Sequence, residues 1–275
     1  MTTVSMARAP ASAAAPAAPP SGSSVRWALA RVEGHRLLAH PLFMLGGALS
    51  TLFFAASSTD GSDSLFALAG GFFVVLGGAV GTFPVACLAA SRARRDAAQD
   101  FYAGQPTTAS LRTEAMLLSL AWIGLAGAAL IVVAAIVLAG PDGALAVAGK
   151  AYTLRPLELA QGPLYLVMVG AFGVLVGSWS RRGYPAVIGA LVLFLPPTPW
   201  LPWITFGEGV PQGFTDDSMV NTSVGWHLAG LVGLTALAAA GALARHDRRP
   251  RVVVLALAGL AATVAGIALG LPSGY

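Results

Sequence analysis

Seven long runs of apolar residues divide the chain after residue 40. They cover residues 41–57, 64–90, 115–139, 157–179, 184–204, 225–244 and 252–271. A helix rises about 1.5 Å per residue, so each run is near or above the length that crosses about 30 Å of hydrocarbon. The pattern predicts an all-α membrane protein, a polytopic helical bundle of about seven transmembrane helices.

Two polar segments precede the first run. Residues 1–24 are mostly Ala, Pro and Ser, and this composition predicts a disordered tail because it buries too little apolar surface to offset the entropy of ordering. Residues 25–40 mix apolar and basic positions and predict an amphipathic helix at the membrane interface. Its candidate interfacial residues are Trp27, Arg31, Glu33 and Arg36. The alternative is a simple cytosolic flank of the first span.

The fifth run, 184–204, contains four prolines in its outer part: Pro196, Pro197, Pro199 and Pro202. Proline removes a backbone donor and clashes with the preceding turn, so this part should be irregular. If the run entered the membrane and returned on the same side, every later loop would change sides. That arrangement would place the arginines of 245–251 outside, so we interpret the run as a span.

Arginine placement predicts the orientation, because loops on the cytoplasmic side are enriched in Lys and Arg. With the N-terminus inside, only Lys150 and Arg155 of the 16 basic residues lie outside. The inner ones are Arg8, Arg26, Arg31, Arg36, Arg92, Arg94, Arg95, Arg112, Arg181, Arg182, Arg245, Arg248, Arg249 and Arg251. Seven spans then place the C-terminus outside the cell. We expect a multi-pass protein of the plasma membrane.

Composition agrees with the membrane class. The chain is 56% hydrophobic and 10% charged, whereas soluble proteins carry about 25% charged residues. Its net charge of +4 could indicate a nucleic-acid partner, but the charges lie beside the apolar runs, which argues against one. The single cysteine, Cys87, is interpreted as a small side chain of the core.

The usual signatures of chemistry are missing from the sequence. There is no P-loop, and the only lysine, Lys150, falls in an outer loop. No His-Glu-x-x-His, His/Cys cluster or Gly-x-Ser-x-Gly occurs. We therefore predict that the chain is not an enzyme and binds no metal or cofactor. The apolar runs also hold almost no ionisable residues, which argues against an ion-coupled carrier.

The segment 91–114, SRARRDAAQDFYAGQPTTASLRTE, interrupts the apolar pattern with charges and aromatic residues. We expect a short helix from about residue 92, ended by Pro106, with Thr108 or Ser110 capping the next helix. Tyr and Arg are frequent anchors in protein contacts. The candidate partner-binding residues are Arg92, Arg94, Arg95, Asp100, Phe101, Tyr102, Gln105 and Pro106.

Three segments resemble the membrane (permease) subunits of ATP-binding-cassette (ABC) transporters of the type-2 exporter class, especially the actinobacterial ones. They are RVEGHRLLAHPLF at 31–43, DFYAGQP at 100–106 and LAQGPLYLVMVGAFGVLVG at 159–177. The resemblance implies a six-span permease core at 41–244. It also implies a second permease subunit and a cytosolic ATPase subunit that binds the ATP. The segment 92–106 would be the coupling helix on that ATPase.

The run at 252–271 departs from this family pattern as an additional C-terminal span. Two other classes of function stay open. One is a membrane scaffold or immunity protein that binds a partner through the same loop, and the other is an ion-coupled secondary carrier. The apolar spans suit a lipid, a hydrophobic drug or a peptide as cargo, and no residue selects among them.

Overall fold

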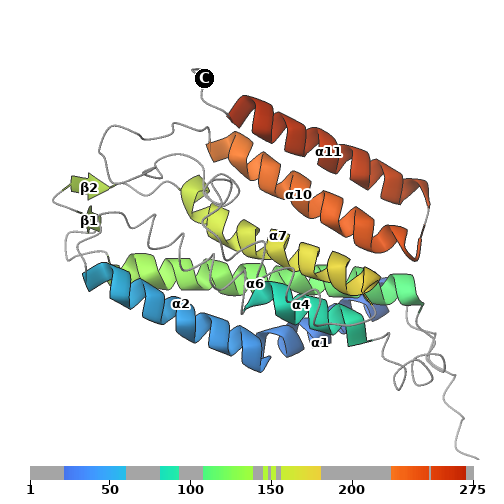
Figure 1. Cartoon of the computed structure of the whole chain (residues 1–275), viewed down its shortest axis with the longest axis horizontal. Coiled ribbons are helices and arrows are strands. Elements are labelled where there is room, and N and C mark those ends of the chain that lie inside the picture. Colours follow the sequence, from blue (N-terminus) through green and yellow to red (C-terminus); the bar gives the residue numbers. More distant parts are fainter. Residues whose placement is uncertain are drawn as a thin grey trace, which may run out of the picture.

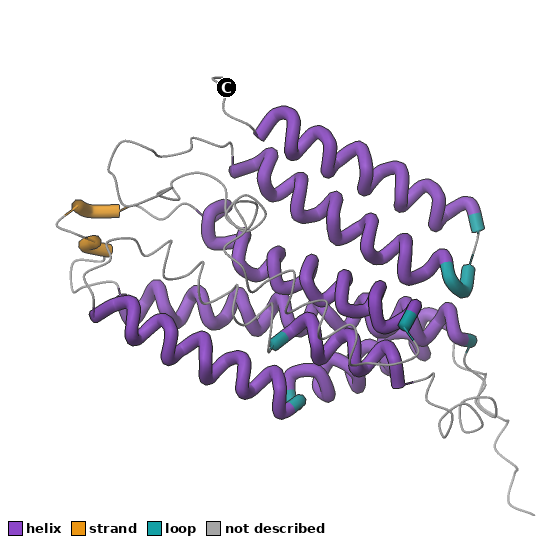
Figure 2. Tube along the Cα trace, viewed as in Figure 1, coloured by secondary structure: helices purple, strands orange, loops and turns teal. Residues whose placement is uncertain are grey.

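The computed structural model describes residues 22–59, 81–92, 108–138, 145–147, 150–152, 156–180, 224–247 and 249–270. This part is helical apart from one small hairpin (Figures 1 and 2). Four of its helices are long and apolar enough to cross a membrane, judged by length and composition. Residues 1–21 of the predicted tail and the fifth apolar run, 184–204, lie outside the described residues.

The first two helices meet at a short break. Helix α1 (Gly22–Leu38) covers most of the predicted segment 25–40, and α2 (Pro41–Thr59) covers the first apolar run. Helix α1 begins three residues early, so the last residues of the predicted tail are helical; small polar residues suit a helix N-terminus. At the break, His40 Nδ1 accepts a hydrogen bond from the amide of Leu42 at 3.2 Å. Pro41 begins α2, where its missing N–H costs nothing.

Helices α4 (Thr82–Ser91), α6 (Ala109–Leu138) and α7 (Pro156–Trp179) form the centre of the bundle. The amide of Leu111 donates to Thr108 Oγ1 at 3.2 Å, so the predicted capping of this helix is confirmed at Thr108. Helix α6 has 30 residues, about 45 Å. The helix begins several residues before its apolar run. Its first two turns therefore contain Arg112 and Glu114, which precede the run.

A two-stranded hairpin connects α6 to α7. Strand β1 (Leu145–Val147) pairs antiparallel with β2 (Lys150–Tyr152), with Leu145 opposite Tyr152. The sequence analysis expected only a loop there, because strands of three residues are too short to show an alternating pattern. The hairpin lies at the end of the bundle where α6 finishes and α7 begins (Figure 1).

Close backbone contacts at glycines set the direction of the central helices. A methyl group on Gly170 would lie 3.2 Å from Thr82 Cγ2, and one on Gly173 would lie 2.9 Å from Ala86 Cβ. Residue numbers therefore rise together along α4 and α7, so the two helices are parallel. A methyl group on Gly124 of α6 would lie 2.9 Å from Val167, whereas Gly170 approaches Leu120. Helix α6 is therefore antiparallel to α7.

The C-terminal helices α10 (Val224–Ala244) and α11 (Pro250–Gly270) form an antiparallel pair. A methyl group on Gly266 would lie 2.5 Å from the amide nitrogen of Gly230, and one on Gly233 would lie 2.5 Å from that of Thr263. Helix α10 lies beside α7 (Figure 1), and the C-terminal ends of these two helices meet at Trp179 and Gly241. Helices α7 and α10 therefore point the same way, while α11 lies at the periphery.

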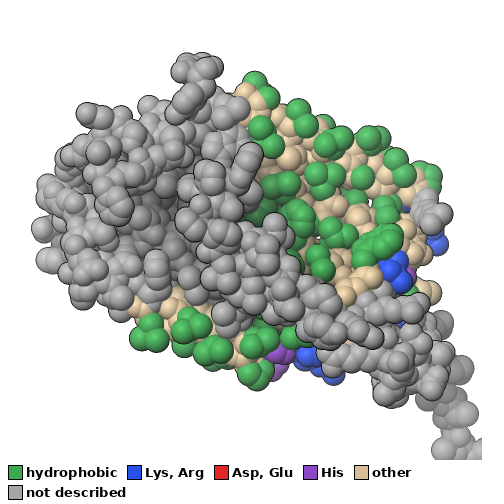
Figure 3. Space-filling model, in the orientation of Figure 1, with side chains coloured by type: hydrophobic (Ala, Val, Ile, Leu, Met, Phe, Trp, Pro, Cys, Tyr) green, Lys and Arg blue, Asp and Glu red, His purple; other side chains and the backbone are tan. Residues whose placement is uncertain are grey.

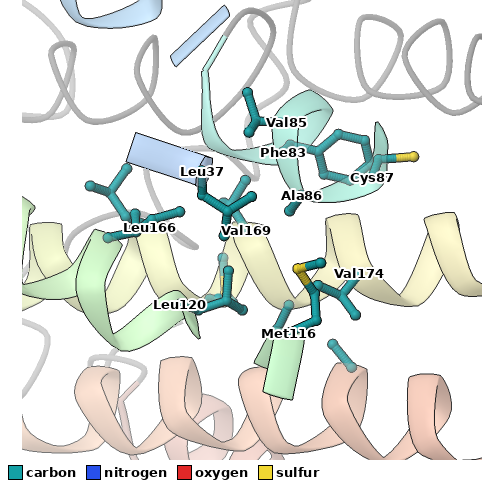
Figure 4. Close-up of a cluster of buried hydrophobic side chains, with 14 of the residues drawn as sticks. Leu37, Phe83, Val85, Ala86, Cys87, Met116, Leu120, Leu166, Val169 and Val174 are labelled. Carbon is teal, nitrogen blue, oxygen red and sulfur yellow. The ribbon is translucent and has the colours of Figure 1, made fainter. Parts of the chain in front are cut away.

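The buried core is apolar and lies between α1, α4, α6 and α7. Figure 4 shows Leu37, Leu120, Leu166 and Val169 gathered in this space. Cys87 is fully buried there, which confirms its predicted role as a core side chain. Large apolar side chains also cover the outer surfaces of α2, α10 and α11 (Figure 3), an arrangement that suits lipid contact.

The glycine contact between α10 and α11 leads to a stability prediction. We expect Gly233→Val to destabilise the protein by about 1–3 kcal/mol, because the new side chain meets the backbone of α11 at Gly259 and Thr263. Thermal unfolding in detergent micelles measures the effect. Gly47→Val is the matched control, since a methyl group on Gly47 would meet no atom within 4 Å. Equal losses in both variants would contradict the packing role of Gly233.

Candidate functional site

Charged side chains of the described residues gather at one end of the bundle, which we call the charged end. They come from the first half of α1, the end of α4, the start of α6 and the turn between α10 and α11. They are Arg26, Arg92, Arg112, Glu114, Arg245, His246, Asp247, Arg249 and Arg251. Part of this group appears in blue at the right of Figure 3. Arg26, Arg92, Arg112, Arg245, Arg249 and Arg251, which the arginine pattern assigned to one side, thus share one end of the bundle, whereas Arg31 and Arg36 lie further along α1.

Glu114 is the centre of an ion-pair network that joins three helices. Its Oε1 lies 2.7 Å from Nη2 of Arg251 on α11, and its Oε2 lies 3.0 Å from Nε of Arg26 on α1. The second contact is an ion pair without hydrogen-bond alignment. The carboxylate is 12% exposed, whereas the side chains of Arg26 and Arg251 are 38% and 49% exposed, so removing it would leave two partly solvated arginines without their shared partner.

Asp247 organises the turn that leads into α11. Its Oδ1 accepts the amide of Arg249 at 3.0 Å, and its Oδ2 accepts Nε of Arg251 at 3.2 Å. The hydrogen bond from Arg251 holds the pKa of Asp247 below its usual range, although burial acts in the opposite direction. Arg251 therefore bridges two carboxylates, Asp247 on its own turn and Glu114 on α6.

The end of α7 is attached to α10 through Trp179. Its indole Nε1 donates to the carbonyl of Gly241 at 2.9 Å, and the guanidinium of Arg245 lies 5.4 Å from the ring centroid, within the range of a cation–π contact. The neighbouring His246 has a lowered pKa because of burial and then the charges of Arg245 and Arg112. The end of α10 is therefore held beside both α7 and α6.

The predicted coupling segment begins and ends at the charged end. Arg92 caps α4 in a helical conformation, and its amide donates to the carbonyl of Ala89. The pKa of His40 is lowered by burial and then by the charge of Arg92. The other predicted partner-binding residues lie outside the described residues: Arg94, Arg95, Asp100, Phe101, Tyr102, Gln105 and Pro106. Their role stays a prediction.

The predicted interfacial residues all belong to α1. Trp27, Arg31 and Arg36 are exposed, and Arg36 pairs with Glu33 at 2.8 Å. The opposite face of α1 packs on α6, where Gly34 touches the ring of Trp122 so closely that a methyl group would not fit. Arg26 is opposite Glu114 and Gly34 is opposite Trp122, so α1 runs parallel to the first half of α6.

Sequence reasoning missed Glu114, Arg26, Arg251 and Asp247 as a connected group. Glu114 and Arg251 are 137 residues apart, so no local spacing relates them. One signal was available. Glu114 and Asp247 are acidic residues in segments otherwise dominated by arginine, and an acid in such a position needs a cation nearby.

Within the described ranges, no group of three or more His, Cys, Asp or Glu side chains could hold a metal ion. No family model, curated protein or solved structure matches the chain. The charged end is therefore best characterised by its geometry: an ion-paired end of the bundle at which α4 ends and α6 begins.

Removing the central carboxylate tests the network. We expect Glu114→Gln to lower the free energy of unfolding by about 1–3 kcal/mol, because two arginines lose their shared partner. Thermal unfolding in detergent gives the measurement. Glu33→Gln is the control, because Glu33 forms only a local i,i+3 pair of the kind that contributes about 0–1 kcal/mol. A smaller loss in Glu114→Gln than in the control would refute the network.

The acid limit of stability tests the pairing of Asp247. Its pKa is lowered in the folded protein, so its contribution is fully present above the ordinary value of about 3.9 and is lost as the pH falls through the lower folded value. We expect Asp247→Asn to be less stable than wild type above pH 4 and to lose less of its stability on acidification. Melting temperatures between pH 3 and pH 7 give the comparison. Parallel curves for the two proteins would exclude this pairing.

Proposed function

We propose that the chain is the permease subunit of an ABC transporter that works with a separate cytosolic ATPase, in the direction of export. The observation that carries the proposal is that α4 ends and α6 begins at the charged end, so both ends of the connecting sequence 93–107 start from there. A segment there is available to a cytosolic partner if the charged end faces the cytoplasm. The choice of this transporter family comes from the resemblance of the segments 31–43, 100–106 and 159–177 to its permease subunits.

The directions of the helices support seven spans. Helices α7 and α10 are parallel and their C-terminal ends meet. Between Ser180 and Val224 the chain therefore has to pass from the charged end to the opposite end of the bundle. This requirement supports a fifth span at 184–204 rather than a segment that enters and returns on one side. The seventh span then leads from the charged end to an extracytoplasmic C-terminus.

The excess of arginine supports a cytoplasmic position for the charged end. Its described arginines outnumber the two carboxylates, Glu114 and Asp247. Cytoplasmic segments near the ends of spans carry such an excess of basic residues. With this orientation the N-terminus is cytoplasmic, and the protein is a multi-pass component of the plasma membrane.

The ion-pair network provides a route for coupling. In the proposed mechanism ATP binding closes the ATPase subunits, and the segment 92–106 moves with them through Phe101 and Tyr102. Helix α6 begins immediately after this segment, and Glu114 in its second turn is paired with α1 and α11. A displacement of α6 would therefore be transmitted to both helices. The ATP chemistry stays in the partner, and this chain contributes the pathway together with a second permease subunit.

The ion-coupled carrier is the less favoured alternative. Residues 115–138, 160–179, 224–244 and 252–270 contain no Asp, Glu, Lys or Arg. Ion- and proton-coupled carriers usually keep such residues at mid-depth in their spans. A membrane scaffold or immunity protein stays a second candidate, since it could use the same loop to bind a partner without transport.

The decisive experiment is purification from native membranes in mild detergent, followed by mass spectrometry of the proteins that co-purify. We expect wild type to recover a P-loop ATPase in stoichiometric amount, and the double variant Phe101→Ala, Tyr102→Ala to lose it because its anchors are gone. Tyr152→Ala is the control, since β2 lies at the other end of the bundle.

Recovery of the ATPase with the double variant would show that these aromatic residues are not its anchors. Recovery of the wild-type chain alone, in detergent that keeps a known transporter complex intact, would overturn the permease proposal. A scaffold would be recognised by a partner whose rate of ATP turnover is the same with and without this chain.

A further inference from the structure

A buried hydroxyl group lies on α7, toward the end of the bundle that is opposite the charged end. Tyr165 is fully buried, and its hydroxyl has no hydrogen-bond partner in the part of the chain that the structure describes. Buried tyrosine hydroxyls usually find a partner, because leaving one unpaired costs free energy. An unpaired hydroxyl inside the bundle is therefore a group that can donate a hydrogen bond to a ligand or accept one from it.

A second polar side chain lies one turn earlier on the same helix. Gln161 is also fully buried. Residues four apart lie on one face of a helix, so Gln161 and Tyr165 are neighbours along α7. Buried glutamine is unusual in an apolar span, and the two residues give this part of α7 a polar face in an otherwise apolar helix.

Helix α10 brings a third polar group to the same level. Leu175 on α7 faces Gly241 on α10, where a methyl group would lie 2.9 Å from Leu175 Cδ1. Fourteen residues before each of these are Gln161 and His227. Fourteen residues are about four helical turns, and the two helices are parallel neighbours (Figure 1). The half-buried His227 therefore lies at the level of Gln161 on the neighbouring helix.

The chemistry of these three groups selects a class of ligand. A phenol, an amide and an imidazole can each donate and accept hydrogen bonds, and none is a permanently charged group. Around them, Leu164 and Leu228 pack against the apolar core. A charged ligand would lose its hydration here without a counter-charge. An uncharged group with both donors and acceptors, carried on an apolar molecule, matches these surroundings.

We propose that Tyr165, Gln161 and His227 form a binding site for the uncharged polar head of an amphiphile, such as a hydroxyl- or amide-bearing lipid. The polar head of the ligand would form the hydrogen bond that the hydroxyl of Tyr165 lacks among the described residues. The role of this ligand as transported cargo rests on the proposed permease function. Binding itself does not, because it needs only the α7–α10 pair.

The test uses the purified full chain in phosphatidylcholine nanodiscs, with mono-oleoylglycerol as the uncharged probe and oleate as the charged probe with the same tail. We expect mono-oleoylglycerol to raise the wild-type melting temperature saturably, by about 2–4 °C, and oleate to have no such effect. Tyr165→Phe should abolish this shift. Its melting temperature without probe should equal or exceed that of wild type, because only an unpaired hydroxyl is removed.

Ser178→Ala is the matched control, because it removes another buried hydroxyl from α7, one that already donates to the carbonyl of Leu175 at 2.8 Å. The control should keep the shift. The proposal is overturned if wild type shows no saturable shift, if Tyr165→Phe keeps the shift, or if oleate acts equally. It is also overturned if Tyr165→Phe without probe is less stable than wild type. No ATPase is present, so these outcomes are independent of the co-purification experiment.

Discussion

The arrangement of the described helices depends on the close approach of backbones at glycines. In lipid the solvent is as apolar as the side chains, so association of helices depends on tight packing rather than on the hydrophobic effect. Helix α7 shows this most clearly: Gly170 and Gly173 admit α4, and Gly241 of α10 admits Leu175 of α7. The pair α10–α11 is held in the same way at Gly233 and Gly266. These close contacts determine the directions of the helices and their relative positions along the bundle axis.

Those relative positions bring the charges together. Once α6, α10 and α11 pack in their observed directions, the start of α6 and the turn between α10 and α11 reach the same end of the bundle. Glu114 then meets Arg251 from one side and Arg26 from the other. The network is therefore a consequence of the glycine packing, and it also ties the peripheral α11 and the N-terminal α1 to the helix that follows the segment 93–107. In the proposed function, this connection is the route by which a partner would act on the bundle.

The opposite end of α7 has a different character. Polar groups there are buried without fixed charge, whereas those at the charged end are ionic and partly exposed. The bundle thus has ionic groups at one end and buried, uncharged polar groups on α7 further along. Under the proposed function, the first would face the partner and the second would hold the ligand.

The sequence by itself determined the helical class, the positions of most helices and the cap at Thr108, because apolar runs and capping residues are local features. Arginine placement also assigned Arg26, Arg112 and Arg251 to one side, and the structure brings these three to one end of the bundle. The hairpin at 145–152, the packing of α1 along α6 and the group around Glu114 and Asp247 came only from the tertiary structure. The same holds for the hydroxyl of Tyr165, which has no hydrogen-bond partner among the described residues. Contacts between residues far apart in the chain follow from packing geometry, and no local pattern encodes them.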